Sequence, residues 1–204
     1  MDILTLQRLL SNLSRHRSPM LNRRNGQLGA VDDYRQAAVL LAIVRQSGEW
    51  QILLTKRADT LRRHTGQIAF AGGACDPDDA NLTATALREA HEEIGTPPSA
   101  WQTFPDMQPC YTPSGYIVHA IPALAEQPPP LHINTAEVAE VFYLPLSYAL
   151  DLNNYQQRSI QHQGITRTIP ALPFRHYDIW GLTAILLHVL AECHADTEAA
   201  RLSG

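Results

Sequence analysis

The chain has 204 residues, of which 45% are hydrophobic and 18% are charged, and its formal net charge is −4. This apolar content is too high for a disordered chain and suits one compact domain with a sizeable core. The acidic balance argues against a nucleic-acid partner, and the apolar runs are shorter than the roughly 20 residues that span a membrane. The three cysteines show no metal-ligand spacing, so we expect a cytoplasmic protein without a disulfide framework.

The N-terminal part is expected to form a short helix followed by a linker. Apolar side chains at helical spacing predict an amphipathic helix over residues 2–13. The stretch 14–33 is polar and rich in Arg, Asn and Gly, which is typical of a connecting segment. We therefore divide the chain into an N-terminal helix and linker over 1–33, a main domain over 34–195 and a tail over 196–204.

The main domain reads as strands interrupted by two helices. Apolar and alternating runs predict strands over residues 36–44, 50–55, 68–71, 101–107, 116–124 and 138–144, and a hairpin over 158–169. Helices are predicted over 81–94, where Gly95 is a suitable stop, and over 180–193. One central and one terminal helix among strands favour an α/β sandwich.

Residues that suit chemistry are concentrated in the predicted central helix. Glu89 lies three residues before Glu92 and four before Glu93, so all three carboxylates share one helix face. Arg88 can orient a neighbouring carboxylate through a two-pronged contact. Hard oxygen donors within one helical turn suit Mg²⁺ or Mn²⁺. Taken alone, the same pattern also fits a solvated acidic face, where like charges cost only about a few tenths of a kcal/mol.

The residues before this helix favour the metal site over the solvated face. Gly72 and Gly73 end a predicted strand, where glycine permits a close backbone approach. An acidic loop with Asp76, Asp78 and Asp79 then leads into the helix. Strand, glycine loop, acidic loop and carboxylate helix together make up one metal-holding unit.

This arrangement resembles the signature of the Nudix hydrolases, which runs Gly, five residues, Glu, seven residues and then Arg-Glu-apolar-x-Glu-Glu-x-Gly-apolar. The half from Arg88 to Gly95 matches throughout. Asp79 stands in place of the earlier Glu, eight residues instead of seven separate it from Arg88, and Thr96 replaces the last apolar residue. The resemblance implies a Nudix-type α/β/α sandwich with a mixed central sheet.

The run LLTKRADTLRRHTGQIAFAGG at residues 53–73 resembles the extended signature of a narrower group, the Nudix coenzyme A pyrophosphatases. That signature contains LLT-x-R, then L-R-x-H-x-G-Q, then F-P-G-G, and Ala71 replaces its proline here. The resemblance implies metal-dependent hydrolysis of the pyrophosphate bond of coenzyme A, or of a derivative. The products would be 4′-phosphopantetheine and adenosine 3′,5′-bisphosphate.

The resemblance also implies roles for individual residues. Glu89, Glu92 and Glu93 are expected to bind Mg²⁺ or Mn²⁺, and the expected catalytic residues are Glu92, Glu93 and Arg88. The general base is left open between Glu92 and a distant carboxylate, either Glu137 or Glu140.

A cluster of basic side chains precedes the double glycine and is expected to face the substrate. Arg57, Arg62 and His64 are expected to bind substrate phosphates, because an Arg fork matches phosphate geometry. The alternative is that these are solvated loop charges. Gln67 and Gly73 complete the expected substrate-binding residues.

Three alternatives stay open. The substrate could be another phosphoanhydride, such as ADP-ribose, a dinucleoside polyphosphate or a nucleoside triphosphate. The chain could also be a non-catalytic Nudix-like module that binds a nucleotide, although such modules are expected to lose carboxylates of the signature. The first and last helices could support a homodimer.

Overall fold

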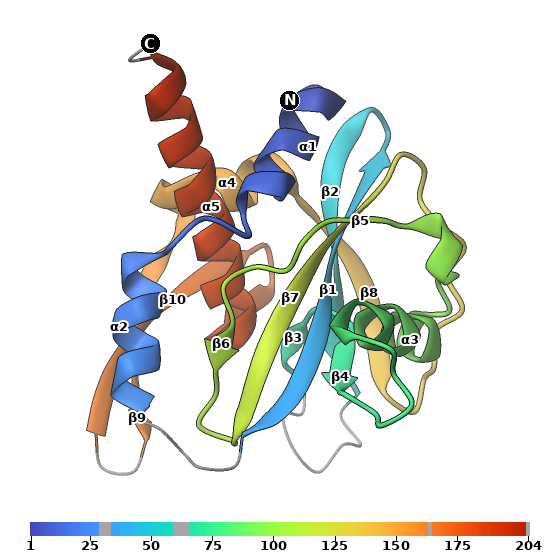
Figure 1. The fold of residues 1–204 in the computed structure, drawn as a ribbon, viewed down its shortest axis with the longest axis horizontal. Helices are drawn as coiled ribbons and strands as arrows, with labels where there is room; N and C mark the ends of the chain where they lie inside the picture. Colours follow the sequence, from blue (N-terminus) through green and yellow to red (C-terminus); the bar gives the residue numbers. More distant parts are fainter. Residues whose placement is uncertain (29–33, 59–65, 163–164, 203–204) are drawn as a thin grey trace.

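The computed structural model describes residues 1–28, 34–58, 66–162 and 165–202. In these ranges it is a mixed α/β sandwich with an eight-stranded sheet, a three-stranded sheet and helices on both faces of the larger sheet (Figure 1). The helices are α1 (Ile3–Asn12), α2 (Pro19–Leu28), α3 (Leu82–Ile94), α4 (Leu146–Leu150) and α5 (Gly181–Leu202), with short 3₁₀ turns at Pro98–Ala100 and Leu152–Asn154. The strands are β1 (Arg35–Gln46), β2 (Glu49–Arg57), β3 (Ile68–Ala69), β4 (Gly72–Ala74), β5 (Gln102–Thr103), β6 (Cys110–Tyr111), β7 (Tyr116–Ala125), β8 (Val138–Pro145), β9 (Gln156–His162), β10 (Ile165–Phe174) and β11 (Tyr177–Trp180).

Strand β1 is the centre of the large sheet. It forms an antiparallel hairpin with β2 and a parallel pair with β7. A parallel pair needs a long crossover, and here the crossover includes α3. The short β4 pairs with the first half of β1, and β8 pairs with β2. This topology places β4, and the end of β2 that pairs with the start of β8, close to helix α3.

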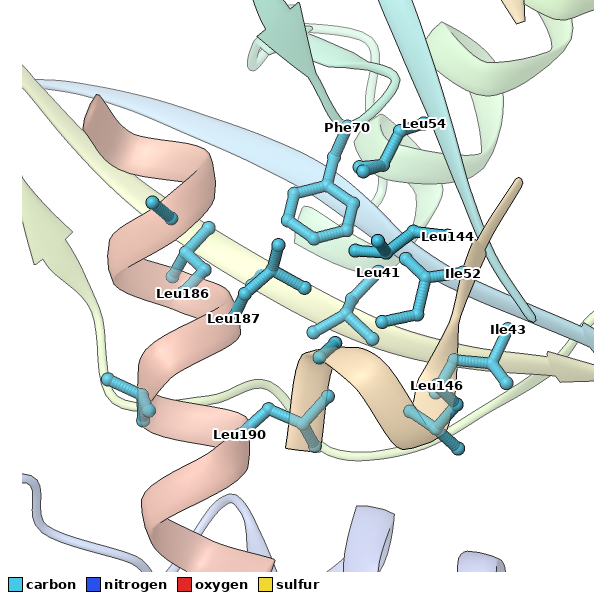
Figure 2. Close-up of a cluster of buried hydrophobic side chains, with 14 of the residues drawn as sticks. Leu41, Ile43, Ile52, Leu54, Phe70, Leu144, Leu146, Leu186, Leu187 and Leu190 are labelled. Carbon is cyan, nitrogen blue, oxygen red and sulfur yellow. The ribbon is translucent and has the colours of Figure 1, made fainter. Parts of the chain in front are cut away.

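Side chains on the two faces of the large sheet form two separate cores. Leu41 and Ile43 of β1 face α5, whereas Leu40 and Ala42 face α3, as the two-residue period of a strand requires. Figure 2 shows the larger core, in which leucines of α5 meet Phe70 and the apolar side chains of β1, β2 and β8. The smaller core fixes α3 on the sheet through Ala86, Ala90 and Ile94, among other residues.

The N-terminal part differs from the predicted helix and linker. Helix α1 forms as predicted, and the Asp2 side chain caps it by accepting a hydrogen bond from the Thr5 amide at 2.8 Å. The predicted linker, however, contains helix α2. Only Leu21 of α2 is buried, and polar contacts such as that from Asn25 Nδ2 to the Pro109 carbonyl, at 2.9 Å, hold this helix in place. Hydrophobic periodicity therefore could not reveal it.

Three further expectations need correction. The strand predicted over 68–71 is reduced to β3, which pairs with β2, and a separate strand, β4, follows it and pairs with β1. The strand predicted over 101–107 is reduced to β5, and the last helix continues to Leu202. Strands β6 and β11 and helix α4 were not expected. Within the described ranges, no helix combines the length and apolarity needed to cross a membrane.

Candidate active site

Helix α3 presents the three glutamates of the signature on one side, and both of its ends are fixed by local chemistry. The Asn81 side chain accepts a hydrogen bond from the Ala84 amide at 2.9 Å and caps the first turn. Gly95 ends the helix in the left-handed conformation, with φ of 72°, which glycine adopts without steric cost. The helix predicted over 81–94 is therefore confirmed.

Arg88 connects the carboxylates of this site. Its Nε and Nη2 atoms donate to the two carboxylate oxygens of Asp79, each at 2.9 Å. Its Nη1 atom donates to Glu89 Oε1 at 2.9 Å and to Glu92 Oε2 at 3.1 Å. The Arg88 guanidinium thus orients two glutamates of the signature.

Asp79 is tied into this arrangement from several directions. Besides the contacts with Arg88, its Oδ2 atom accepts hydrogen bonds from the Asp76 amide and the Thr85 hydroxyl, both at 2.9 Å. The hydrogen bonds from Arg88 hold the pKa of Asp79 well below its usual range. The carboxylate therefore stays charged and anchors Arg88, so the shorter side chain and longer spacing still give a two-pronged ion pair.

Glu93 is the innermost of the three glutamates, with 4% of its surface exposed. The Gly72 amide donates to its Oε2 atom at 3.2 Å, and Arg57 Nη1 lies 3.7 Å from its Oε1 atom. Burial raises the pKa of Glu93 to about 7, although the contacts with Gly72 and Arg57 oppose this shift. The protein thus holds a carboxylate that is costly to ionise unless positive charge comes close.

Glu89 lies against the glycine loop. A Cβ atom added to Gly73 would lie 2.5 Å from the Glu89 carboxyl carbon, so glycine is the residue that leaves room for this side chain. Burial raises the pKa of Glu89, and the neighbouring Arg88 opposes the shift. Gly73 is predicted to bind substrate, and the structure shows that its lack of a side chain accommodates Glu89.

Glu137 is a fourth glutamate at this site, supplied by the segment before β8. Its charge contributes to the raised pKa values of both Glu89 and Glu93. Glu140, the other distant carboxylate considered, lies on the face of β8 that packs toward α5, where the Tyr177 hydroxyl donates to it. The structure therefore brings Glu137, and not Glu140, to the glutamates of α3.

The donor set has the chemistry that Mg²⁺ or Mn²⁺ requires, namely hard carboxylate oxygens around a buried acid with a raised pKa. The described His, Cys, Asp and Glu side chains nevertheless do not form a ready-made group of three metal ligands. Arg88 Nη1 is hydrogen-bonded to both Glu89 and Glu92. We therefore expect a cation to bind the other oxygen of each carboxylate while Arg88 keeps these two contacts.

The predicted substrate-binding residues are only partly covered by the described structure. Arg57 lies beside Glu93, and its Nε atom is buried without a hydrogen-bond partner among the described residues. The carbonyl of Gln67 accepts a hydrogen bond from the Arg57 amide at 3.0 Å, so these two residues are neighbours. Arg62 and His64 lie outside the described residues.

Comparison with known proteins matches most of the chain to one family. A NUDIX domain profile matches residues 33–163. An uncharacterized Nudix hydrolase NudL of Photorhabdus laumondii is 42% identical over 161 residues, which cover 79% of this chain and 86% of the relative. Another uncharacterized NudL, from Cronobacter sakazakii, is 40% identical over 188 residues, which cover 92% of this chain and 94% of the relative.

Solved structures share the fold at low sequence identity. The Nudix hydrolase RenU of M. smegmatis has a TM-score of 0.54 and 20% identity, covering 79% of this chain and 86% of that chain. A MutT protein of Methanosarcina mazei has a TM-score of 0.52 and 18% identity, covering 82% of this chain and 99% of that chain. These likenesses confirm the expected sandwich with a mixed central sheet.

Proposed function

The chain belongs to the Nudix hydrolase family, and on that premise we propose that it hydrolyses the pyrophosphate bond of coenzyme A or of a coenzyme A derivative. The products are 4′-phosphopantetheine and adenosine 3′,5′-bisphosphate. The extended motif at residues 53–73 supports this substrate over other phosphoanhydrides.

The observation that carries the proposal is the position of Arg57 beside Glu93. The carboxylates of α3 suit a divalent cation, and Arg57 adds a guanidinium whose buried Nε atom has no hydrogen-bond partner in the described part of the chain. A diphosphate needs positive charge on both sides, from a cation and from an Arg fork that matches its oxygens. Arg57 and the α3 carboxylates therefore suit a diphosphate better than a neutral substrate.

Glu89, Glu92 and Glu93 would hold Mg²⁺ or Mn²⁺. When bound, the cation supplies Lewis acidity to the diphosphate. Arg57 binds a phosphate of the substrate, and Arg88 keeps Glu89 and Glu92 in place. The charged signature residues of α3 thus each have an assigned role, as cation ligands (Glu89, Glu92 and Glu93) or as a residue that positions ligands (Arg88).

We assign the role of proton acceptor to Glu137. Water attacks one phosphorus, the anhydride P–O bond breaks, the leaving phosphate takes the bond electrons, and the water proton moves to a carboxylate. Glu92 is paired with the Arg88 guanidinium and would lose that pairing on taking a proton. Glu137 is held by the neutral amide of Asn134 instead, so it accepts a proton without breaking an ion pair.

The direct test is product identification after incubating the purified protein with coenzyme A and Mg²⁺ or Mn²⁺. ADP-ribose, a dinucleoside polyphosphate and a nucleoside triphosphate are assayed beside it. We expect mass spectrometry to find both coenzyme A products and their loss with Glu93→Gln. Cleavage of another compound with coenzyme A left intact would reject the substrate. Tight nucleotide binding without hydrolysis would indicate a non-catalytic module.

The proton acceptor is tested with Glu137→Gln and Glu92→Gln. Loss of a general base typically reduces kcat by about 10²- to 10⁴-fold, and we expect this for Glu137→Gln. Glu92→Gln should reduce the affinity for the cation instead. The assignment is wrong if Glu92→Gln loses kcat in this range at saturating cation while Glu137→Gln keeps it.

A further inference from the structure

The segment that supplies Glu137 is fastened to the last turn of α3. The His132 amide donates to the Ile94 carbonyl at 2.8 Å, and the Asn134 amide donates to the Glu93 carbonyl at 2.9 Å. Carbonyls in the last turn of a helix have no partner within the helix, so this segment satisfies two of them. The segment therefore moves with the part of α3 that carries Glu93.

Gly95 makes this attachment sterically feasible. A Cβ atom at position 95 would lie 2.5 Å from the His132 Cβ atom and 2.7 Å from its backbone nitrogen. Any larger residue at the end of α3 would push the segment away. The glycine that ends the signature helix thus also allows Glu137 to approach the site.

Asn134 uses both ends of its side-chain amide within this segment. Its Oδ1 atom accepts a hydrogen bond from the Ala136 amide at 3.2 Å, and its Nδ2 atom donates to Glu137 Oε1 at 3.0 Å. The Asn134 carbonyl also accepts hydrogen bonds from the amides of Glu137, at 3.0 Å, and Val138, at 2.9 Å. The contact with the Ala136 amide closes a turn, and the contact with Glu137 Oε1 fixes the rotation of that carboxylate.

Glu137 is held from the side of β2 as well. Its carbonyl accepts a hydrogen bond from the Ala58 amide at 2.8 Å, immediately after Arg57. Its backbone is therefore fixed beside the proposed phosphate-binding residue, and only its side-chain rotation needs a further partner. Among the described residues, Asn134 donates a hydrogen bond to this carboxylate.

From these contacts we infer that Asn134 is a positioning residue for Glu137, holding one carboxylate oxygen so that the other faces the reacting water. This inference rests on the proposed function. An amide suits the task because it donates a hydrogen bond and carries no charge. A Lys or Arg side chain in its place would neutralise the carboxylate. Aspartate has the same shape but would set a second carboxylate against Glu137.

The test is a double-mutant cycle with Asn134→Asp, Glu137→Gln and the double variant. Asn134→Asp keeps an oxygen for the Ala136 amide and loses the donor to Glu137. Residues that orient a functional group typically account for about 10- to 100-fold in activity, so we expect kcat to fall by that factor and KM to change less than about twofold. Asn154→Asp is the matched control, because Asn154 Nδ2 donates to the Tyr148 carbonyl at 3.0 Å away from the site.

In the Glu137→Gln background, Asn134→Asp should cause no further loss of kcat. The side-chain amide introduced at position 137 would then donate to the carboxylate introduced at position 134, so the hydrogen bond would be kept with reversed polarity. The inference would be overturned if the losses of kcat caused by Asn134→Asp and Glu137→Gln multiplied in the double variant. It would also be overturned if the kcat of Asn134→Asp stayed within about twofold of the wild type.

A second cycle, measured by urea unfolding, keeps the test separate from the proposed activity. Loss of the contact should shift the unfolding equilibrium by about fivefold in the Glu137 background and less in the Glu137→Gln background. If the purified protein cleaves none of the assayed phosphoanhydrides, the proposed function is refuted. The unfolding cycle would still show whether Asn134 holds Glu137, and additive unfolding effects would overturn the inference by themselves.

Discussion

Arg88 and Asp79 meet as two planar groups side by side, with Nε and Nη2 of the guanidinium each 2.9 Å from one carboxylate oxygen. The third guanidinium nitrogen, Nη1, points to Glu89 and Glu92. Asp79 therefore acts on the glutamates of α3 through Arg88.

The first prediction concerns this ion pair. Asp79→Asn keeps the side-chain shape but turns one oxygen into a donor that opposes Arg88. We expect kcat to fall by about 10- to 100-fold and the free energy of unfolding to fall by about 1–3 kcal/mol. Steady-state kinetics and urea unfolding measure these quantities.

Asp78→Asn is the control for Asp79→Asn. Asp78 lies in the same loop and is exposed, so its substitution should change stability by no more than about 0.5 kcal/mol. Equal effects of the two substitutions would show that loop charge matters and the two-pronged contact does not.

The sequence predicted the part of the site that lies within a single helix. The spacing of Glu89, Glu92 and Glu93 determines their common face as soon as α3 forms. The position of Glu137 depends on hydrogen bonds from His132 and Asn134 to the end of α3, and such contacts between distant segments leave no periodic signal in the chain. For that reason Glu137 and Glu140 could not be ranked before the structure was known.

The same reasoning explains one departure from the family signature and leaves another unexplained. Thr96 replaces an apolar residue and is fully buried, yet its hydroxyl accepts a hydrogen bond from the Trp101 indole at 3.4 Å. Ala71 replaces proline, and its carbonyl accepts a hydrogen bond from the Leu40 amide at 2.8 Å. Proline has the same carbonyl and would make the same contact, so nothing in the structure explains this substitution. The contact of Thr96 is a tertiary contact that satisfies the buried hydroxyl, and motif comparison alone shows only the mismatch.

The second prediction concerns the space between the glycine loop and α3. Gly73→Ala would place a methyl group 2.5 Å from the Glu89 carboxyl carbon, so Glu89 must move. We expect weaker Mn²⁺ binding by calorimetry and a kcat at least about tenfold lower, with an unchanged circular dichroism spectrum.

Gly26→Ala is the control for this glycine. A Cβ atom at Gly26 in α2 would meet nothing within 4 Å, and alanine is favoured over glycine in a helix by about 0.8–1 kcal/mol. This variant should keep full activity and gain stability. If Gly73→Ala binds Mn²⁺ as tightly as Gly26→Ala, the close approach of Gly73 and Glu89 is not important for the site.

The third prediction follows from the ionisation of Glu93. Its pKa is raised from 4.5 to about 7 in the folded protein, so the folded state holds this proton more tightly than the unfolded state. The stabilisation is fully present below pH 4.5 and is lost as the pH rises to about 7, by about 3 kcal/mol in the metal-free protein. Urea unfolding at a series of pH values measures this slope.

Glu93→Gln should remove most of the loss between pH 4.5 and about 7, because glutamine does not ionise. Asp79 does not account for the slope, since its pKa is lowered and its contribution is lost at more acidic pH. Adding Mg²⁺ at about pH 8 should stabilise the wild type and not Glu93→Gln, because a ligand that binds only the folded state shifts unfolding by mass action. A pH slope of equal size in both proteins would refute the assignment to Glu93.

The fourth prediction tests whether the N-terminal helix belongs to the folded core. Leu10 of α1 is fully buried in the core shared with α5, whereas Leu4 of the same helix is 63% exposed. Leu10→Ala should lower the free energy of unfolding by about 2–5 kcal/mol, since it removes buried methyl groups and leaves a cavity. Leu4→Ala should change it by no more than about 0.5 kcal/mol. Both variants have the same helix propensity change, so a difference between them isolates burial. If the two substitutions were equally mild, α1 would contribute nothing to the stability of the core, and that result would support the predicted division of the chain before residue 34.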